Sequence, residues 1–139
     1  MGKMRVAVSG ACGRMGQQVC QTILQEEDLE LVGAFDLQDQ GKDLGIILEN
    51  RPLGITIEEL TPENLKKYQP AVMVDFTTPM VVMHNIKIAL QCGVRPVVGT
   101  TGITQVDLAR ISQQVEEFGL SAMIAPNFAL GAVLMMKFA

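Results

Sequence analysis

The stretch Gly10-Ala11-Cys12-Gly13-Arg14-Met15-Gly16 decides the fold of this chain. It follows the apolar segment Met4–Ser9 and leads into a helix-like segment at 15–25. Its spacing is G-x-x-G-x-x-G, in which the first glycine allows a sharp turn and the second lets a pyrophosphate approach the backbone. The third glycine lets the helix pack closely on the strand. A strand, a glycine loop and a helix in this order predict a dinucleotide-binding unit.

An acidic residue ends the second predicted strand. Leu29–Phe35 is apolar, and Asp36 comes 20 residues after the last glycine of the loop. A carboxylate at this position can accept hydrogen bonds from the hydroxyls of an adenosine ribose. Leu37 follows it where a cation would favour a 2′-phosphate, so the sequence favours NADH over NADPH. Arg14 and Lys42 still leave NADPH as an alternative.

The rest of the chain alternates strand-like and helix-like segments. Strands are predicted at 55–57, 72–76, 96–99 and 120–125, and helices start at Thr61-Pro62-Glu63 and span 79–91 and 104–118. The last helix has a capping-box pattern in Thr104 and Asp107, and Gly119 fits its end. The segment 37–54 is predicted as a loop. This alternation predicts an α/β fold, a Rossmann-like, doubly wound parallel sheet in a single domain.

The composition excludes several classes of protein. The chain has 139 residues with 48% hydrophobic and 19% charged residues, which suits one folded domain. It has a net charge of −4 and no basic tract, so we expect no nucleic-acid partner. It has no apolar run long enough for a membrane span, and its three cysteines make no disulfide framework. The lack of a membrane span and of a disulfide framework predicts a cytoplasmic protein. The His and Cys residues do not have the spacing of metal ligands, so we expect no metal.

Three further loops follow predicted strands, at the edge of the sheet where ligands bind in such folds. Residues 75–78 (Asp-Phe-Thr-Thr) are polar there, although they could equally cap the next helix. Residues 99–102 (Gly-Thr-Thr-Gly) offer hydroxyl and N–H donors for a carboxylate. In 125–128, Asn127 could bind a carboxamide and Phe128 offers an aromatic wall. Each loop alone could be a simple turn, but together with the glycine loop they indicate a site.

Two reactive side chains lie near these loops in the sequence. Cys12 is close to a helix N-terminus, which lowers the pKa of a thiol, so a redox role is open. A small side chain that fits the loop is the simpler interpretation. His84 is the only histidine, and we expect it on the helix Pro79–Gln91, away from the strand ends and without a catalytic role.

Four motifs together resemble one family. They are GACGRMG at 10–16, VDFTTP at 74–79, GTTG at 99–102 and APNF at 125–128, and they resemble 4-hydroxy-tetrahydrodipicolinate reductase, also called dihydrodipicolinate reductase. The resemblance covers essentially the whole chain. It implies an oxidoreductase that reduces 4-hydroxy-tetrahydrodipicolinate, a dicarboxylate, to tetrahydrodipicolinate with NADH or NADPH, in lysine and diaminopimelate biosynthesis.

The resemblance also implies roles for individual residues. Residues 10–15 would hold the pyrophosphate, and Asp36 would hold the adenosine ribose. Residues 99–101 would lie near the nicotinamide, with Thr101 also reaching a substrate carboxylate, and 125–128 would close over the nicotinamide ribose and carboxamide. The implied cofactor-binding residues are Gly10, Ala11, Cys12, Gly13, Arg14, Met15, Asp36, Gly99, Thr100, Thr101, Ala125, Pro126, Asn127 and Phe128.

The chain departs from the family after its last apolar segment. Family members continue into a second, α+β substrate-binding domain that carries a His-His pair, a lysine and a carboxylate-binding loop. We therefore expect 1–129 to be the dinucleotide-binding domain and 130–139 to begin the connection to a missing domain. We expect no catalytic residue here and no activity of the chain alone. The family's homotetramer is built largely through that domain, which leaves the oligomeric state of this chain open.

Two other functions fit the same residues. A stand-alone NAD-binding sensor would need only the nucleotide site. The nucleotide domain of another Rossmann dehydrogenase is the second alternative. Sugar and inositol dehydrogenases share the Thr78-Pro79 strand end and a histidine in the following helix, but they usually have an E-K-P turn where this chain has 99–102.

Overall fold

The computed structural model describes residues 2–125, so the predictions for Pro126, Asn127, Phe128 and 130–139 lie outside the described residues. The elements in order are β1 (Met4–Ser9), α1 (Arg14–Gln25), β2 (Leu29–Phe35), α2 (Leu44–Glu49), β3 (Ile57–Glu58), α3 (Pro62–Tyr68), β4 (Val72–Asp75), α4 (Pro79–Gln91), β5 (Arg95–Val98), α5 (Gln105–Phe118) and β6 (Met123–Ile124).

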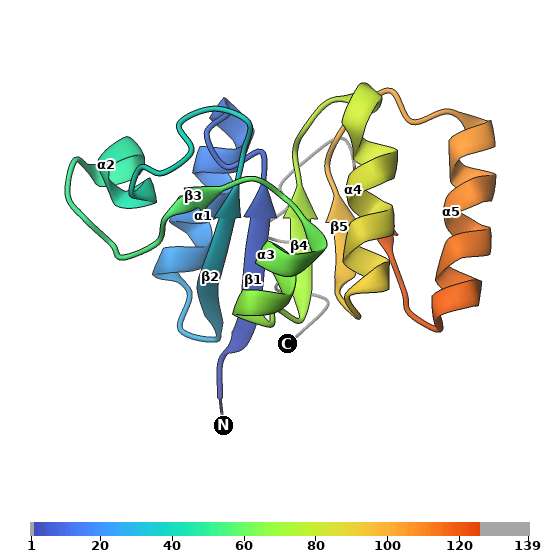
Figure 1. The fold of residues 1–139 in the computed structure, drawn as a ribbon, viewed down its shortest axis with the longest axis horizontal. Coiled ribbons are helices and arrows are strands. Elements are labelled where there is room, and N and C mark those ends of the chain that lie inside the picture. Colours follow the sequence, from blue (N-terminus) through green and yellow to red (C-terminus); the bar gives the residue numbers. More distant parts are fainter. Residues whose placement is uncertain (1, 126–139) are drawn as a thin grey trace.

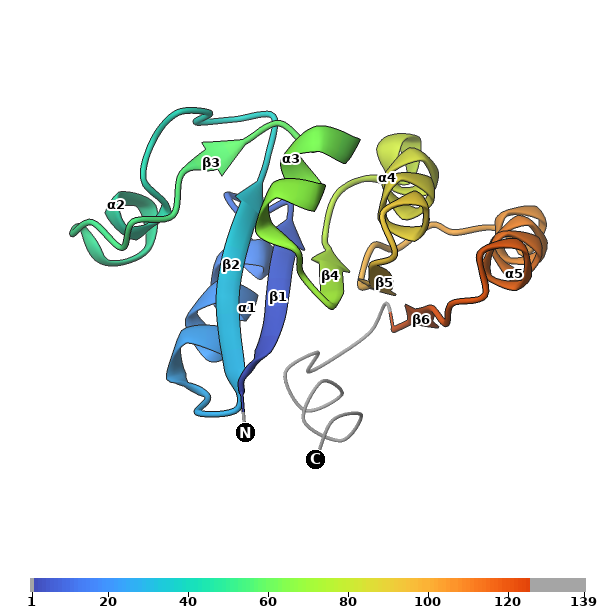
Figure 2. The same cartoon turned by 60° about the horizontal axis from the view of Figure 1, so that its bottom comes forward.

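The strands form one parallel sheet. Its order is β3-β2-β1-β4-β5-β6, and every neighbouring pair is parallel. The chain runs outward from β1 to β3 and then returns to the other side of β1, so the order reverses between β1 and β4. Helix α1 covers one face of the sheet, while α3 and α4 cover the other (Figures 1 and 2). The predicted Rossmann-like, doubly wound sheet is confirmed.

Burial on both faces explains why the strands are apolar along their whole length. Val6 and Val8 of β1 pack in one cluster with Ile23 of α1. Ala7, between them, packs in a second cluster on the opposite face, with Ala89 of α4. Side chains of a strand alternate between faces, so a strand covered on both sides needs apolar residues at every position.

An irregularity in β2 changes which side chains face which helix. Val6 pairs with Leu31, but the next residue, Ala7, pairs with Gly33, so β2 contains one extra residue. Leu31 lies in the cluster beside α1, and Phe35 lies in the cluster beside α3 and α4. Strict alternation would place these two side chains on the same face, because they are four residues apart.

Most predicted elements have nearly the predicted bounds, but the strand predicted at 55–57 is found at Ile57–Glu58 and the sixth strand is shorter than predicted. The segments Met4–Ser9, Leu29–Phe35 and Pro79–Gln91 have the predicted bounds, and the Thr104 capping box is present. The sixth strand was predicted at 120–125 but spans only Met123–Ile124. Its first part is used to end α5.

The end of α5 is a Schellman motif. The N–H of Gly119 donates to the carbonyl of Glu116, and the N–H of Leu120 donates to that of Val115. Gly119 has a φ of +67°, which fits its predicted place at the end of the helix. Because Leu120 completes the helix end, it is not available to the sheet.

The prediction of a loop at 37–54 is wrong for its central part, where α2 forms. The Asp43 side chain begins this helix by accepting a hydrogen bond from the Gly45 N–H at 2.7 Å. The same carboxyl group accepts from the N–H groups of Leu53 and Gly54, each at 2.8 Å. Hydrogen bonds from these backbone groups, that of Leu53 first, hold the pKa of Asp43 below its usual range.

The glycine loop is packed too tightly for side chains at two positions. Gly10 has a φ of +83°, and a Cβ on it would overlap the carbonyl oxygen of Phe76. A Cβ on Gly16 would overlap the carbonyl oxygen of Gly10. Helix α1 therefore packs closely on the loop itself, where the sequence predicted close packing on the strand. A Cβ on Gly13 would meet only the Gly10 oxygen, at 3.6 Å, so this position is open.

Replacing Gly16 by alanine should destabilise the fold. The new methyl group would overlap backbone atoms, which no rotamer change can relieve, so we expect the free energy of unfolding to fall by about 1–3 kcal/mol. This loss should exceed the gain from the higher helix propensity of alanine. Urea denaturation followed by circular dichroism measures it. Gly13→Ala is the matched control, with an expected change of roughly 0.5 kcal/mol. Equal losses in both variants would contradict the packing argument.

Candidate nucleotide-binding site

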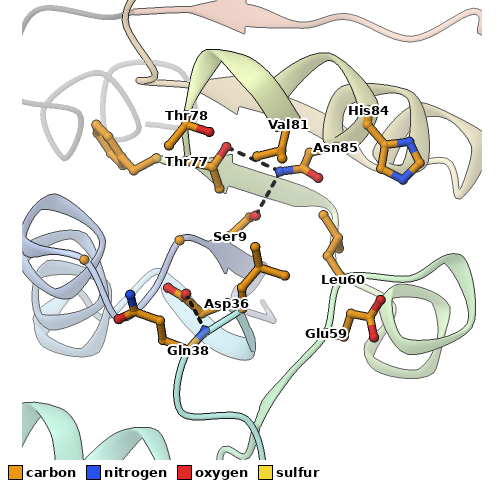
Figure 3. Close-up of a pocket in the computed structure, with 14 residues that line it drawn as sticks. Ser9, Asp36, Gln38, Glu59, Leu60, Thr77, Thr78, Val81, His84 and Asn85 are labelled. Carbon is orange, nitrogen blue, oxygen red and sulfur yellow. Dashed lines mark hydrogen bonds between the residues drawn. The ribbon is translucent and has the colours of Figure 1, made fainter.

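A pocket of about 420 Å³ lies at the carboxyl ends of β1, β2 and β4 (Figure 3). This is the edge of the sheet at which the strand order reverses, where ligands bind in open α/β folds. Its volume is within the range of small-molecule sites. The residues that line it are Ser9, Gly10, Gly13, Asp36, Leu37, Gln38, Glu59, Leu60, Phe76, Thr77, Thr78, Val81, His84 and Asn85.

Asp36 is tied to the glycine loop by a hydrogen bond. Its Oδ2 accepts from the N–H of Cys12 at 2.9 Å, and its Oδ1 accepts from the N–H of Gln38 at 3.0 Å. The N–H of Gly10 in turn donates to the carbonyl of Phe35 at 2.8 Å. A carboxylate has about four lone-pair sites, so Asp36 keeps acceptor capacity toward the pocket. The structure thus brings together the two features from which the sequence predicted a nucleotide site.

The N-terminus of α1 opens beside this carboxylate. Its N-cap is Gly13, which supplies no side chain to bond the first N–H groups, and no acidic residue lies in the first turn. The first N–H groups of a helix have no partner within the helix and carry a partial positive charge. Ala11 is buried, whereas Arg14 and Met15 are exposed in the first turn and do not line the pocket.

A buried carboxyl group lies beneath the pocket at the end of β4. Asp75 has no exposed surface. Its Oδ1 accepts from the N–H of Thr77 at 3.0 Å, the hydroxyl of Thr77 at 2.6 Å and the hydroxyl of Thr100 at 3.1 Å. Its Oδ2 accepts from the Asn85 side chain at 2.9 Å. These donors come from the loop after β4, the loop after β5 and helix α4.

The alternative that residues 75–78 cap α4 with their side chains is therefore wrong. Thr78 is the N-cap of α4, but its side chain makes no capping hydrogen bond. Asp75 and Thr77 bond to each other instead. Pro79 at the first helical position lacks an N–H, which removes one of the donors that a cap would satisfy.

The loop 99–102 packs against Phe76 and the buried Asp75, and it exposes one side chain, that of Thr101. A Cβ on Gly99 would overlap the ring of Phe76. Thr100 is buried, and its hydroxyl also accepts a hydrogen bond from the N–H of Thr77 at 3.0 Å. Thr101 is exposed. None of these three residues lines the pocket described above, and Ala125 is buried below the edge of the sheet.

The sequence reasoning missed several of the residues that line the pocket, among them two on α4 and two that follow β3. His84 is exposed on α4 and lines the pocket, where the sequence placed it away from the strand ends. Asn85 lies between Ser9 and Thr77, to both of which its Nδ2 donates (Figure 3). Glu59 and Leu60 follow β3. The sequence did contain one signal, because Asn85 lies among the apolar residues of α4. A buried polar side chain needs hydrogen-bond partners, which indicates other polar groups nearby.

The expectation that the pKa of Cys12 is lowered is wrong. Burial first, and then the negative charges of Asp36 and Asp39, together raise the pKa of this thiol to about 12. These effects exceed that of the helix N-terminus nearby. The thiol donates weakly to the carbonyl oxygen of Gln38 at 3.6 Å. Burial also raises the pKa of Cys20 to about 12 and that of Cys92 in the same direction.

The described residues contain neither a cluster of metal ligands nor a membrane-spanning helix. Within 2–125, no three His, Cys, Asp or Glu side chains are arranged to hold a metal ion. No helix in that part of the chain is long and apolar enough to cross a membrane.

Comparison with known proteins identifies relatives along the whole chain. Residues 4–128 match the family model described as dihydrodipicolinate reductase, N-terminus. The 4-hydroxy-tetrahydrodipicolinate reductase of Desulfitobacterium hafniense (strain Y51) is 51% identical over 140 residues, covering 100% of this chain and 52% of that protein. The protein of the same name from Listeria monocytogenes (serotype 4b, strain F2365) is 47% identical and covers 98% and 52%. The chain spans about half the length of these curated relatives.

Solved structures agree with this assignment. A dipicolinate-bound dihydrodipicolinate reductase from Paenisporosarcina sp. TG-14 has a TM-score of 0.73 at 41% identity, covering 98% of this chain and 52% of that one. An amine dehydrogenase from Mycobacterium smegmatis has a TM-score of 0.74 at 23% identity, covering 86% and 38%, and shares the fold alone. The family match decides against the nucleotide domain of another dehydrogenase family. The chain belongs to the dihydrodipicolinate reductase family, and it matches the N-terminal part of that family.

Proposed function

We propose that this chain binds NADH for the reduction of 4-hydroxy-tetrahydrodipicolinate to tetrahydrodipicolinate. The observation that carries the proposal is the hydrogen bond from the Cys12 N–H to the Asp36 carboxylate. This hydrogen bond joins the glycine loop to Asp36 at the end of β2, and both line the same pocket. Bound NADH would supply a hydride, and the residues of this chain would hold and orient it.

The phosphate half of the proposed site is the glycine loop with the start of α1, residues 10–15. Gly13 has open space where a side chain would be, and α1 begins without a side-chain cap. Both features suit a pyrophosphate, which binds to free N–H groups at a helix N-terminus. The carboxylate of Asp36 would accept hydrogen bonds from the hydroxyls of the adenosine ribose.

The charges around Asp36 favour NADH over NADPH. The pocket is lined by two carboxylates, those of Asp36 and Glu59, and by no lysine or arginine in the described part of the chain. Lys42 pairs with Asp39 at 2.9 Å, and this hydrogen bond raises its pKa. A 2′-phosphate would therefore meet negative charge, with no lysine or arginine among the described residues that line the pocket.

The nicotinamide half of the proposed site includes Gly99, Thr100, Thr101 and residues 125–128. Thr100 would not contact the cofactor directly. It would fix the position of the loop 99–102, because its hydroxyl donates a hydrogen bond to the buried Asp75. Thr101 is exposed and free to reach a substrate carboxylate. A dicarboxylate substrate is supported by the relative that is described as dipicolinate-bound. We propose that catalytic groups and the homotetramer contacts belong to the part of the relatives that this chain does not span.

Calorimetric titration with NADH and NADPH tests the cofactor proposal. We expect NADH to bind with a micromolar to submillimolar Kd and NADPH to bind about 10-fold more weakly, a difference of roughly 1.4 kcal/mol. Asp36→Ala should abolish the measurable binding of NADH, because it removes the ribose acceptor. Asp28→Ala removes an exposed carboxylate outside the pocket and should bind like the original chain. Tighter binding of NADPH would overturn the assignment of Asp36, and binding of neither would overturn the proposal.

Gly13→Ala should weaken NADH binding while the fold stays intact. The methyl group would fill the space that we assign to the pyrophosphate, and we expect a loss of about 10-fold or more in affinity. The same titration measures this loss, and urea denaturation checks that the free energy of unfolding changes by no more than the roughly 0.5 kcal/mol expected for this position. An alanine variant with the original affinity would show that the phosphates bind elsewhere.

Cys12 should contribute its backbone N–H and not a reactive thiolate. With a pKa of about 12 in place of 9.0, the fraction of Cys12 that is ionised to the thiolate at pH 8 is about 1000-fold smaller. We expect alkylation of Cys12 by iodoacetamide at pH 8 to be at least about 100-fold slower in the native chain than in urea. Mass spectrometry of the Cys12 peptide measures both rates. Similar rates in the two states would restore the redox interpretation.

A further inference from the structure

The pocket continues beyond the residues to which the proposed function assigns a role. At its far end lie Glu59 and Leu60, which follow β3, and His84 on α4 (Figure 3). Asp36 and Gln38 lie at the opposite end (Figure 3). If Asp36 holds the ribose, the space that leads from Asp36 toward Glu59 is open to the nucleobase attached to that ribose.

The walls of this space suit a flat aromatic ring. Leu37, Leu60 and Val81 line it and provide apolar surface. Leu37 has 78% of its surface exposed, so it is available to a ligand. A ring covered by such side chains leaves only its edge for polar recognition, and ligand pockets commonly combine apolar walls with a few polar groups that fix orientation.

The carboxylate of Glu59 differs from that of its neighbour in having no partner among the described residues. Glu58 forms an ion pair with Lys67 at 3.0 Å and accepts a hydrogen bond from the hydroxyl of Tyr68. The Glu59 carboxylate makes no hydrogen bond or ion pair within 2–125. Its backbone is nevertheless held, since the Asn64 side chain donates to the Glu59 carbonyl at 2.9 Å. Glu59 therefore offers a free acceptor from a fixed position on the pocket wall.

We propose that Glu59 makes this pocket specific for adenine by accepting a hydrogen bond from the 6-amino group of the base. This inference rests on the proposed function. Adenine carries an amino donor at position 6, whereas hypoxanthine and guanine carry a carbonyl acceptor there. An ionised carboxylate can only accept hydrogen bonds, so it matches the amino group and repels the carbonyl oxygen.

The test compares NADH with reduced nicotinamide hypoxanthine dinucleotide, in which the 6-amino group is replaced by oxygen. Calorimetric titration of the 139-residue chain should give about 10-fold tighter binding of NADH, since the analogue loses a charge-assisted hydrogen bond. Glu59→Gln should reduce this preference to about 3-fold or less, because a carboxamide can accept from an amino group and also donate to a carbonyl. Glu59 is exposed, so the substitution leaves the packing of the core unchanged.

The matched control is Glu63→Gln, which removes the same charge from an exposed position in the first turn of α3 that does not line the pocket. It should keep the full preference for NADH. Equal binding of the two dinucleotides, or a preference that Glu59→Gln leaves unchanged, would overturn the role of Glu59 while the cofactor proposal stands. Binding of neither dinucleotide would overturn both.

Discussion

The buried carboxyl group of Asp75 and its hydrogen bonds are the interaction on which the architecture of the site depends. A carboxyl group without exposed surface is costly unless its oxygens are bonded, and Asp75 accepts from four donors. Thr77, Thr100 and Asn85 supply these donors from three separate segments. If any of these segments moved, its hydrogen bond to Asp75 would break and leave a buried polar atom without a partner. The network therefore fixes the loop after β4, the loop after β5 and the first turns of α4 relative to one another.

Close backbone contacts connect Asp75 to the glycine loop at the other end of the pocket. The N–H of Phe76, next to Asp75, donates to the carbonyl of Ser9 at 2.9 Å. The Phe76 carbonyl occupies the space of a Cβ on Gly10, and the Gly10 carbonyl occupies that of a Cβ on Gly16. Such contacts between backbone atoms leave no room for adjustment. Of the three glycines in the loop, the first and third are therefore fixed by packing, and Gly13 is left open toward the pocket.

The parts of this structure that could be predicted from the sequence are those determined by neighbouring residues. The glycine loop, Asp36 at the end of β2 and the Thr104 capping box each depend on a short stretch of chain, so their local patterns were sufficient. The extra residue in β2 depends on pairing with β1, which no local pattern records. The raised pKa of Cys12 depends on burial and on Asp36, which is 24 positions away along the chain. Helix α2 did have a local signal, Asp43 before an apolar run, which the Gly- and Asp-rich surroundings obscured.

The same distinction separates the two halves of the site. The proposed phosphate and ribose half comes from one β-α-β unit, in which a hydrogen bond joins Asp36 directly to the glycine loop. The proposed nicotinamide half includes Thr100, whose hydroxyl bonds to a residue 25 positions earlier in the chain. Among the described residues, the partners of Asp75 lie between the loop after β4 and the loop after β5, so this chain itself supplies the hydrogen bonds at the base of the pocket. The proposed cofactor half of the site is therefore positioned by hydrogen bonds formed within the described part of this chain.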